Sequence, residues 1–455
     1  MLSFSHALLK RHEVRAPSYT SYPGLDQFKQ AFGPRHYAQA LEHRRQSVLT
    51  RLKPLAVYVH LPFCENLCFF CNRFKIVTKR YSKTLAYLEL IEQELKLQIE
   101  HLGHKPKVSQ LHLSGGTPTY LHTAELERLV TMLKSNTTFT PEVEMSLDVD
   151  PRTVNQDTLG ALRDMGFGRL NFSVQDCDAG VQRAVHRLQD FDAIHALFEQ
   201  SRLLGFESCG LELLYGLPKQ TQKSFAATLA RVVALSAERV ILTPYHHQPE
   251  TFAPQRKIKE QDLPSSHWTM ECFNTALTTL LKAGYDYIGL DLFAKKSDPL
   301  SLAKRQGRLH RNFLGFSAQP NTDLMGLGMS GIGAIGSTYS QNATTLEEYS
   351  MFLERKQLPV VKGLMLTRDD LIRKSVIMGL MCQGHLSYES IELAYFIDFP
   401  NYFAQELQQL QHLEEEGLVQ LTAKSLDVTE LGSVLVRSIA SVFDRYWTAA
   451  HSSHL

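Results

Sequence analysis

Two periodicities of apolar and polar positions alternate along the first two thirds of the chain. Short apolar, β-branched runs predict strands at 55–62, 108–114, 142–149, 169–175, 208–215 and 239–245. Segments with helical periodicity follow them and predict helices at 81–102, 123–135, 155–165, 190–204, 222–236 and 264–284. Six strand–helix units in sequence imply an α/β fold with a parallel sheet and right-handed crossovers. Eight units would close a TIM barrel, so six indicate an open, partial (β/α)6 barrel.

The pattern changes after residue 361. Helices are predicted at 367–381 and 402–416, a hairpin across 417–429, and a last helix at about 430–446, an order that resembles a winged helix. The segment 404–416 carries four glutamates, which argues against a DNA-binding face and favours a lid or cap over the barrel mouth. We therefore expect four parts: an irregular N-terminal arm (1–50), the partial barrel (51–295), a glycine-rich loop and connecting region (296–360), and a mainly helical, winged-helix-like C-terminal domain (361–455).

Composition narrows the class of protein. The 455 residues are 44% hydrophobic and carry a formal net charge of +1, which fits a soluble globular protein and gives no general attraction to nucleic acid or anionic membranes. The charge-free stretch 324–346 is rich in glycine and polar residues, so we expect a loop near a ligand and no membrane span. The first residues lack the features of a signal peptide. Seven cysteines, an odd number, suit a reducing compartment, and we expect the cytoplasm.

Three of these cysteines are closely spaced. Cys64, Cys68 and Cys71 form a Cys-x3-Cys-x2-Cys pattern directly after the first predicted strand. Three thiolates on one tight loop suit three corners of a [4Fe–4S] cluster, which leaves the fourth iron open to a small molecule. Zinc is the alternative, but structural zinc sites usually take two separated pairs of ligands, and the chain has no second Cys-x2-Cys.

Polar residues also follow the other predicted strands. Ser114-Gly-Gly-Thr117 follows the second strand, Asp148 lies near the end of the third, and Gln175 ends the fourth. Glu212 lies in the fifth, and Tyr245-His-His247 ends the sixth. In βα barrels the chemistry lies where strands end and loops begin. We therefore expect these side chains to share one rim with the cysteines and to form a cofactor pocket.

A series of motifs resembles one enzyme family. In chain order they are Tyr58-Val-His-Leu-Pro-Phe-Cys64, Gly115-Gly-Thr-Pro-Thr-Tyr-Leu121, Val149-Asp-Pro-Arg152, Val174-Gln-Asp176, Tyr215-Gly-Leu-Pro-Lys-Gln-Thr221, Gln255-Arg-Lys-Ile-Lys259, His310-Arg-Asn-Phe313 and Leu366-Thr-Arg-Asp-Asp370. With the cysteine spacing, they resemble the oxygen-independent coproporphyrinogen III oxidase (dehydrogenase) family of radical S-adenosylmethionine (radical SAM) enzymes. The resemblance covers nearly the whole chain from about Tyr19.

The resemblance implies which residues bind the cofactors. Cys64, Cys68 and Cys71 would hold one [4Fe–4S] cluster, and two SAM molecules are expected. Residues at SAM-contacting positions are Tyr58, Gly115, Gly116, Thr117, Asp148, Gln175, Arg187, Glu212, His246 and Ile332. Asp148 stands where the family usually has Glu, and Glu212 where it usually has Asp. Arg311, in a basic run from Lys295, is the candidate for binding substrate propionates. Alone, His246 and Arg187 would be interpreted as structural residues.

The implied reaction is oxidative decarboxylation of two coproporphyrinogen III propionates to vinyl groups, which gives protoporphyrinogen IX in haem biosynthesis. A low-potential donor such as flavodoxin or ferredoxin, and a monomeric state, are also expected. One departure leaves alternatives open: the family usually has a fourth, catalytic cysteine where this chain has Arg73. We keep Arg73 and His246 as catalytic candidates. The alternatives are a related enzyme that acts on another tetrapyrrole and a non-catalytic haem-binding or haem-delivery protein.

Overall fold

The computed structural model of the chain describes residues 17–320 and 322–447, and these residues divide into two compact units. The barrel unit comprises residues 28–273 and 322–365. The second unit comprises the described parts of 1–27, 274–321 and 366–455. The part of the expected N-terminal arm before residue 17 lies outside the described residues.

Parallel strands in chain order form the centre of the barrel unit. Each pairs with the next along the chain: β1 (Leu55–Leu61), β4 (Lys107–Gly115), β5 (Thr138–Val149), β6 (Arg169–Gln175), β7 (Ser208–Tyr215) and β8 (Arg239–Pro244). Most of their residues are buried on both faces, as in parallel sheets covered by helices. The prediction of six parallel βα units is confirmed.

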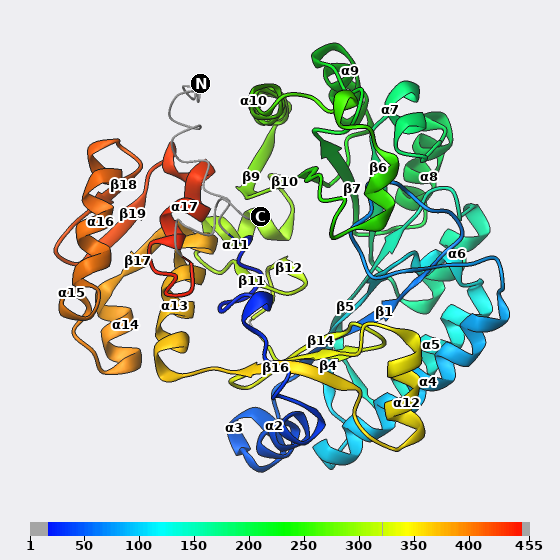
Figure 1. Cartoon of the computed structure of the whole chain (residues 1–455), viewed down its shortest axis with the longest axis horizontal. Helices are drawn as coiled ribbons and strands as arrows, with labels where there is room; N and C mark the ends of the chain where they lie inside the picture. Colours follow the sequence, from blue (N-terminus) through cyan, green and yellow to red (C-terminus); the bar gives the residue numbers. More distant parts are fainter. Residues whose placement is uncertain (1–16, 321, 448–455) are drawn as a thin grey trace. The chain divides into compact units, whose positions relative to one another are not determined.

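Helices cover the outer side of these strands (Figure 1). They are α4 (Ser82–Leu102), α5 (Thr123–Asn136), α6 (Gln156–Met165), α8 (Phe191–Leu203) and α9 (Gln222–Leu235). Local sequence signals set their ends. For example, the side chain of Asn155 caps α6 by accepting a hydrogen bond from the Thr158 N–H, and α4 ends at Gly103, whose φ of +68° suits glycine.

The prediction of a glycine-rich loop at 324–346 is wrong, because most of these residues form strands that extend the sheet. β13 (Leu324–Leu327) pairs in parallel with β1, and β14 (Ile332–Ile335), β15 (Thr338–Asn342) and β16 (Val360–Met365) continue antiparallel from it. A Cβ on Gly326 would lie 2.4 Å from the carbonyl oxygen of Ile332, so glycine permits a close backbone approach here. Strands built with such small residues have little of the apolar alternation that marks a strand in a sequence.

The expectation of an irregular arm is also wrong for residues 34–46. They form helix α2 (Pro34–Gln46), with Pro34 in the first turn, where a missing N–H is harmless. Tyr37 and Leu41, four residues apart, are buried, and the buried Arg44 pairs with Asp323 at 2.8 Å. The prolines had suggested a loop, but this one starts a helix.

The second unit combines short hairpins with helices. The hairpins are β9 (Tyr285–Gly289) with β10 (Leu292–Lys295), and β11 (His310–Asn312) with β12 (Gly315–Ser317). The main helices are α11 (Pro299–Arg305), α13 (Arg368–Gln383), α14 (Tyr388–Tyr395) and α16 (Ala404–Glu415), while α10 (Ser266–Lys282) spans the division between the units.

The predicted C-terminal hairpin is present. β18 (Val419–Leu421) and β19 (Ser425–Val428) pair, and β17 (His385–Ser387) joins them in a small sheet. The last predicted helix is shorter than expected: α17 spans only Val436–Ser441. Asp444 explains the end of the helical segment, because its side chain accepts hydrogen bonds from the backbone N–H groups of Tyr446 and Trp447 and forms a turn.

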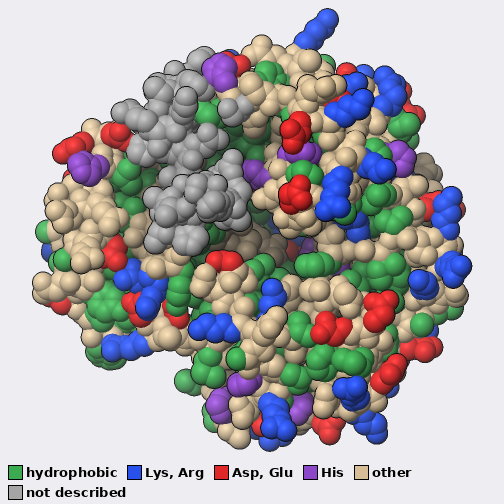
Figure 2. All heavy atoms as spheres, in the orientation of Figure 1, with side chains coloured by type: hydrophobic (Ala, Val, Ile, Leu, Met, Phe, Trp, Pro, Cys, Tyr) green, Lys and Arg blue, Asp and Glu red, His purple; other side chains and the backbone are tan. Residues whose placement is uncertain are grey.

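The face drawn in Figure 2 carries acidic and basic side chains intermixed, in keeping with the near-zero net charge. No helix among residues 17–320 and 322–447 combines the length and the apolar character needed to span a bilayer.

Candidate functional site

A cavity of about 360 Å³ lies at the carboxyl ends of the barrel strands. Its volume falls within the range of small-molecule sites. Most of the predicted site residues contribute to its lining: Cys64, Cys68, Cys71, Arg73, Gly116, Thr117, Asp148, Gln175, Arg187, Glu212 and His246. The structure therefore brings the cysteine loop and five strand ends to one place within the barrel unit.

Backbone hydrogen bonds hold the start of the cysteine loop against the end of β4. The Gly116 N–H donates to the carbonyl of Leu61 and the Thr117 N–H to that of Phe63, each at 2.8 Å. A Cβ on Gly116 would lie 2.4 Å from the Pro62 carbonyl oxygen, so only glycine fits this approach. The Thr117 hydroxyl lies 3.5 Å from the Cys64 sulfur. Burial raises the pKa of the Cys64 thiol to about 11, so a thiolate there requires a compensating positive charge such as a metal.

Two arginines flank the second cysteine. Arg187 Nη1 lies 3.5 Å and Arg152 Nη2 3.8 Å from the sulfur of Cys68, and both guanidinium groups share Asp150 as their carboxylate partner. Burial raises the pKa of Asp150, but Arg187 and Arg152 lower it more, so the carboxyl is ionised. One negative and two positive charges therefore lie beside Cys68, an environment that stabilises a thiolate.

Asp148 lies at the end of β5 in a dense hydrogen-bond network. Its Oδ2 accepts from the Ser114 hydroxyl at 2.5 Å, and its Oδ1 accepts from the Asn171 amide at 3.2 Å. His112 approaches it to 3.9 Å, but burial lowers the pKa of His112, so the imidazole is uncharged at neutral pH. Burial raises the pKa of Asp148, but the electrostatic effects of His112 and Arg73 and the hydrogen bonds from Ser114 and Asn171 together lower it by more, to a net value below the usual 3.8. Asp148 is therefore a negative charge in the cavity.

Arg73 supplies the cation next to Asp148. Its Nη1 donates to the Ser114 hydroxyl at 2.9 Å and to Asp148 Oδ2 at 3.2 Å, and its Nη2 lies 3.7 Å from Glu212 Oε1. Burial lowers the pKa of Arg73, but the carboxylates of Glu212 and Asp148 raise it to a net value above normal. The guanidinium thus bridges two of the acids predicted to contact SAM.

Glu212 and Gln175 form the opposite part of the lining. Glu212 Oε2 accepts from the Ser173 hydroxyl at 3.2 Å and from the Gln175 amide at 3.4 Å. Gln175 ends β6 with a φ of +68°, an uncommon conformation for a residue other than glycine and one often found at functional sites. Within the described part of the chain, the buried Gln175 Oε1 has no hydrogen-bond partner. This oxygen is a ready acceptor for a ligand donor.

Four other predicted site residues lie in the barrel unit, and three of them are outside the cavity lining. His246 lines the cavity after the end of β8. Gly115 precedes the lining residue Gly116, with a φ of +119°. Tyr58 lies on β1 and its hydroxyl contacts His60 Nδ1 at 3.1 Å, outside the lining. Ile332 begins β14 and is also outside the lining.

Arg311 lies in the second unit, where other parts of that unit hold its side chain. Its guanidinium donates to the carbonyls of Tyr19 and Ser18 and stacks 4.5 Å over the Phe316 ring. Each of these contacts is internal to the second unit, so substrate binding by Arg311 stays a prediction.

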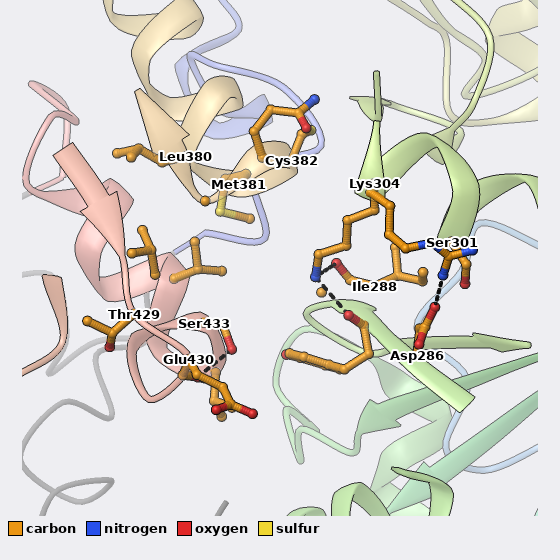
Figure 3. A pocket seen from close by; sticks show the side chains of 18 of the residues that line it. Asp286, Ile288, Ser301, Lys304, Leu380, Met381, Cys382, Thr429, Glu430 and Ser433 are labelled. Carbon is orange, nitrogen blue, oxygen red and sulfur yellow. Dashed lines mark hydrogen bonds and ion pairs between the residues drawn. The ribbon is translucent and has the colours of Figure 1, made fainter. Parts of the chain in front are cut away.

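The neighbouring basic run is partly structural. A cavity of about 510 Å³ lies in the second unit. Lys304, one of its lining residues (Figure 3), donates from Nζ to the carbonyls of Tyr287 and Ile288 at 2.7 and 2.8 Å. Arg305 pairs with Asp286 at 2.5 Å. These two basic side chains are thus satisfied by the protein itself, and sequence proximity to Arg311 does not make them part of a propionate clamp.

Sequence reasoning missed the roles of Asp150 and Arg152. Both belong to the motif Val149-Asp-Pro-Arg152, directly after β5, but only their family resemblance had been used. The available signal was their position directly after a strand end, which places them on the same rim of the barrel as the cysteines. The contact of Arg152 with Cys68 depends on the path of the cysteine loop and could not be predicted from spacing.

The lining fits an iron–sulfur cluster with SAM beside it. Among residues 17–320 and 322–447, no three Cys, His, Asp or Glu side chains converge closely enough to hold a single metal ion. A cubane is wider than an ion, and all three cysteines that could hold one line this cavity. The carboxylates of Asp148 and Glu212 suit sugar hydroxyls, and Gln175 Oε1 suits an amino group.

Comparisons with known proteins agree with this site. Residues 58–232 match the Radical SAM superfamily, and residues 366–435 match the HemN C-terminal domain. The oxygen-independent coproporphyrinogen III oxidase of Salmonella typhimurium is 42% identical over 440 residues, which cover 97% of this chain and 95% of that protein. The Pseudomonas aeruginosa protein of the same name is 40% identical over 441 residues, with 96% and 95% covered.

A solved structure gives the same result. Coproporphyrinogen III oxidase (HemN) from Escherichia coli, a radical SAM enzyme, superimposes with a TM-score of 0.92 at 42% identity and covers 98% of this chain and 100% of that one. The radical SAM fold predicted from the motifs is confirmed. The chain belongs to the oxygen-independent coproporphyrinogen III oxidase family.

Proposed function

We propose that this chain is a radical SAM oxidoreductase that converts two propionates of coproporphyrinogen III to vinyl groups and so produces protoporphyrinogen IX. The observation that carries the proposal is the single cavity that joins three clustered cysteines to Asp148, Gln175, Arg187 and Glu212 in a chain of this family. When bound, the reduced cluster and SAM would supply the radical chemistry that removes a hydrogen atom from the propionate β-carbon, and loss of CO2 with transfer of one electron to an external acceptor would leave the vinyl group.

In this proposal the residues of the chain bind the cluster and orient SAM and the substrate. Cys64, Cys68 and Cys71 hold the cluster, and the hydrogen bonds from Arg152 and Arg187 to Cys68 tune its potential. Such a mechanism requires orientation and exclusion of water more than acid–base groups.

Other residues of the lining position SAM. Asp148 and Glu212 accept hydrogen bonds from its hydroxyl groups, and Gln175 Oε1 accepts one from an amino group. This assignment rests on the ionised state of Asp148 and on the absence of a partner for Gln175 Oε1 within the described residues.

Further parts of the proposal rest on the family resemblance. We propose a second SAM beside Ile332, substrate propionates at Arg311, and a low-potential donor such as flavodoxin or ferredoxin. We also propose a monomer in the cytoplasm. Seven cysteines, with the clustered three as ligands, support a reducing compartment.

Arg73 favours a second candidate, either a related enzyme that acts on another tetrapyrrole or a non-catalytic haem-binding or haem-delivery protein. An arginine cannot donate hydrogen or an electron as a thiol does. Its guanidinium is already paired with Asp148 and Glu212, so the site lacks the reactive group usual at this position.

One anaerobic experiment separates the two candidates. Reconstituted protein is incubated with SAM, reductant and coproporphyrinogen III, and CO2, 5′-deoxyadenosine and porphyrin masses are measured together. We expect CO2 and the loss of two carboxyl groups in step with 5′-deoxyadenosine. Deoxyadenosine without CO2, even with an added electron acceptor, would reject the coproporphyrinogen reaction and favour the second candidate.

A further inference from the structure

The side chain of Arg73 crosses the cavity from the cysteine loop to the ends of three strands. It reaches Ser114 at the end of β4, Asp148 at the end of β5 and Glu212 on β7. The loop backbone around it is held separately, since Lys75 Nζ donates to the carbonyls of Cys71 and Arg73. The guanidinium can therefore move without the backbone that carries the cysteines.

Both acids have hydrogen-bond donors other than Arg73. Asp148 also accepts hydrogen bonds from Ser114 and Asn171, and Glu212 Oε2 accepts from Ser173 and Gln175. These partners are donors on the strands themselves. The strand ends thus hold the two acids in place. Arg73 contributes a positive charge beside them and is not needed to position them.

Arg73 is the loosest member of this network. Its side chain is 42% exposed, whereas those of Asp148 and Glu212 are 12% and 15% exposed. Its contact with Glu212, at 3.7 Å, is longer than a hydrogen bond. Because part of its side chain already contacts solvent, the guanidinium can be hydrated when it leaves the two acids.

We propose that Arg73 is an internal, displaceable cation that occupies the SAM-binding acids Asp148 and Glu212 and must withdraw from them when SAM binds. The inference rests on the assignment of SAM to this cavity. Two consequences follow. SAM carries a positive sulfonium, so it and the guanidinium repel each other in one small cavity. The SAM hydroxyls also need the carboxylate oxygens that Arg73 now faces, so Arg73 lowers the affinity for SAM.

Binding to the cluster-loaded protein tests the proposal without turnover. Equilibrium dialysis of SAM, and separately of the uncharged 5′-deoxyadenosine, is performed without reductant for the natural protein, Arg73→Ala and Arg73→Gln. Iron content and cluster absorbance check that each variant is loaded. Arg80→Ala is the matched control, because Arg80 is an exposed arginine of the same segment that does not line the cavity.

We expect both Arg73 variants to bind SAM and 5′-deoxyadenosine roughly two- to fivefold more tightly than the natural protein, with no change for Arg80→Ala. Equal or weaker SAM binding by the Arg73 variants would overturn the inference and leave the proposed function standing.

Two further outcomes are decisive. Tighter binding of SAM without tighter binding of 5′-deoxyadenosine would mean that Arg73 only repels charge, and would overturn the claim that it occupies the acids. Failure of every loaded variant to bind SAM would overturn both this inference and the assignment of SAM to the cavity.

Discussion

Replacement of Glu94 by glutamine tests whether a buried carboxylate holds the glycine-rich strands in place. Glu94 lies on α4 with no exposed surface. Its Oε2 accepts from the Gly328 N–H at 2.7 Å and the Tyr349 hydroxyl at 2.6 Å. Its Oε1 accepts from the Asn342 and Gln98 amides at 2.7 and 3.0 Å. Four donors therefore face one carboxyl group.

The expected cost follows from this geometry. A glutamine oxygen in the Oε1 position would keep the Asn342 and Gln98 bonds, because both amides are also fixed by bonds to other carbonyls. Its NH2 group would then face the Gly328 N–H, a backbone donor that cannot turn away. Leaving such a buried donor unsatisfied costs about 1–3 kcal/mol. We expect a thermal midpoint lower by roughly 2–8 °C.

The pH dependence gives a second, independent signal. Burial raises the pKa of Glu94 from 4.5 to about 7, against the lowering effect of its hydrogen bonds. The folded state therefore binds a proton that the unfolded state releases between these values, so stability falls as pH rises through the window. From pH 6 to pH 8 the natural protein should lose about 1 kcal/mol that Glu94→Gln does not lose. The difference in stability between the natural protein and Glu94→Gln should therefore be about 1 kcal/mol smaller at pH 8 than at pH 6.

Differential scanning calorimetry of cluster-loaded protein at pH 6 and pH 8 measures both effects. Other titrating groups act alike in the two proteins and cancel in the difference. Glu100→Gln is the matched control, since Glu100 is an exposed residue of the same helix. A gap of the same size at both pH values, or a Glu94→Gln protein as stable as the natural one, would refute the reasoning.

Three further predictions concern the site and the second unit. Cys68→Ser should lose iron and sulfide in chemical assays while Cys177→Ser keeps both, and full iron content in Cys68→Ser would contradict the cluster assignment. Asp150→Asn leaves the buried Arg187 without its carboxylate and should cost about 3 kcal/mol, seen as a lower thermal midpoint; an unchanged midpoint would show that the pair is dispensable. Lys304→Met removes donors from two carbonyls and should destabilise the protein by about 1–2 kcal/mol with an unchanged KM for coproporphyrinogen III, whereas a raised KM would place Lys304 at the substrate.

The parts of the fold that could be predicted are those with strong periodicity. The six parallel strands were found because apolar, β-branched runs alternate with amphipathic helices, and both signals are local. Strands β13 to β15 could not be found in this way. Strands β13 and β14 have only four residues each and contain a glycine, while β15 is largely polar, so none shows a clear alternation. The glycines permit close contacts such as that of Gly326 with Ile332, and the sequence pattern of a single strand does not reveal such contacts.

In the candidate site too, some features could be predicted from local sequence signals and others could not. Cys64, Asp148 and Gln175 were found because they follow predicted strands, and parallel strands deliver their carboxyl ends to one rim. The ion pairs of Arg73 were missed, because a side chain that leaves a loop has no periodic signal and its partners lie on three different strands. The sequence shows that residue 73 is an arginine, but it does not show where the side chain of Arg73 points.

The backbone bonds from Gly116 and Thr117 to the carbonyls of Leu61 and Phe63 have a consequence for how a cluster is assembled on this chain. They fix the backbone next to Cys64 before any iron arrives, because the sheet itself makes them. Cys64 would therefore offer a ligand whose backbone is already in place, and the thiols of Cys68 and Cys71, on the same loop, would act at high effective concentration once a metal is bound.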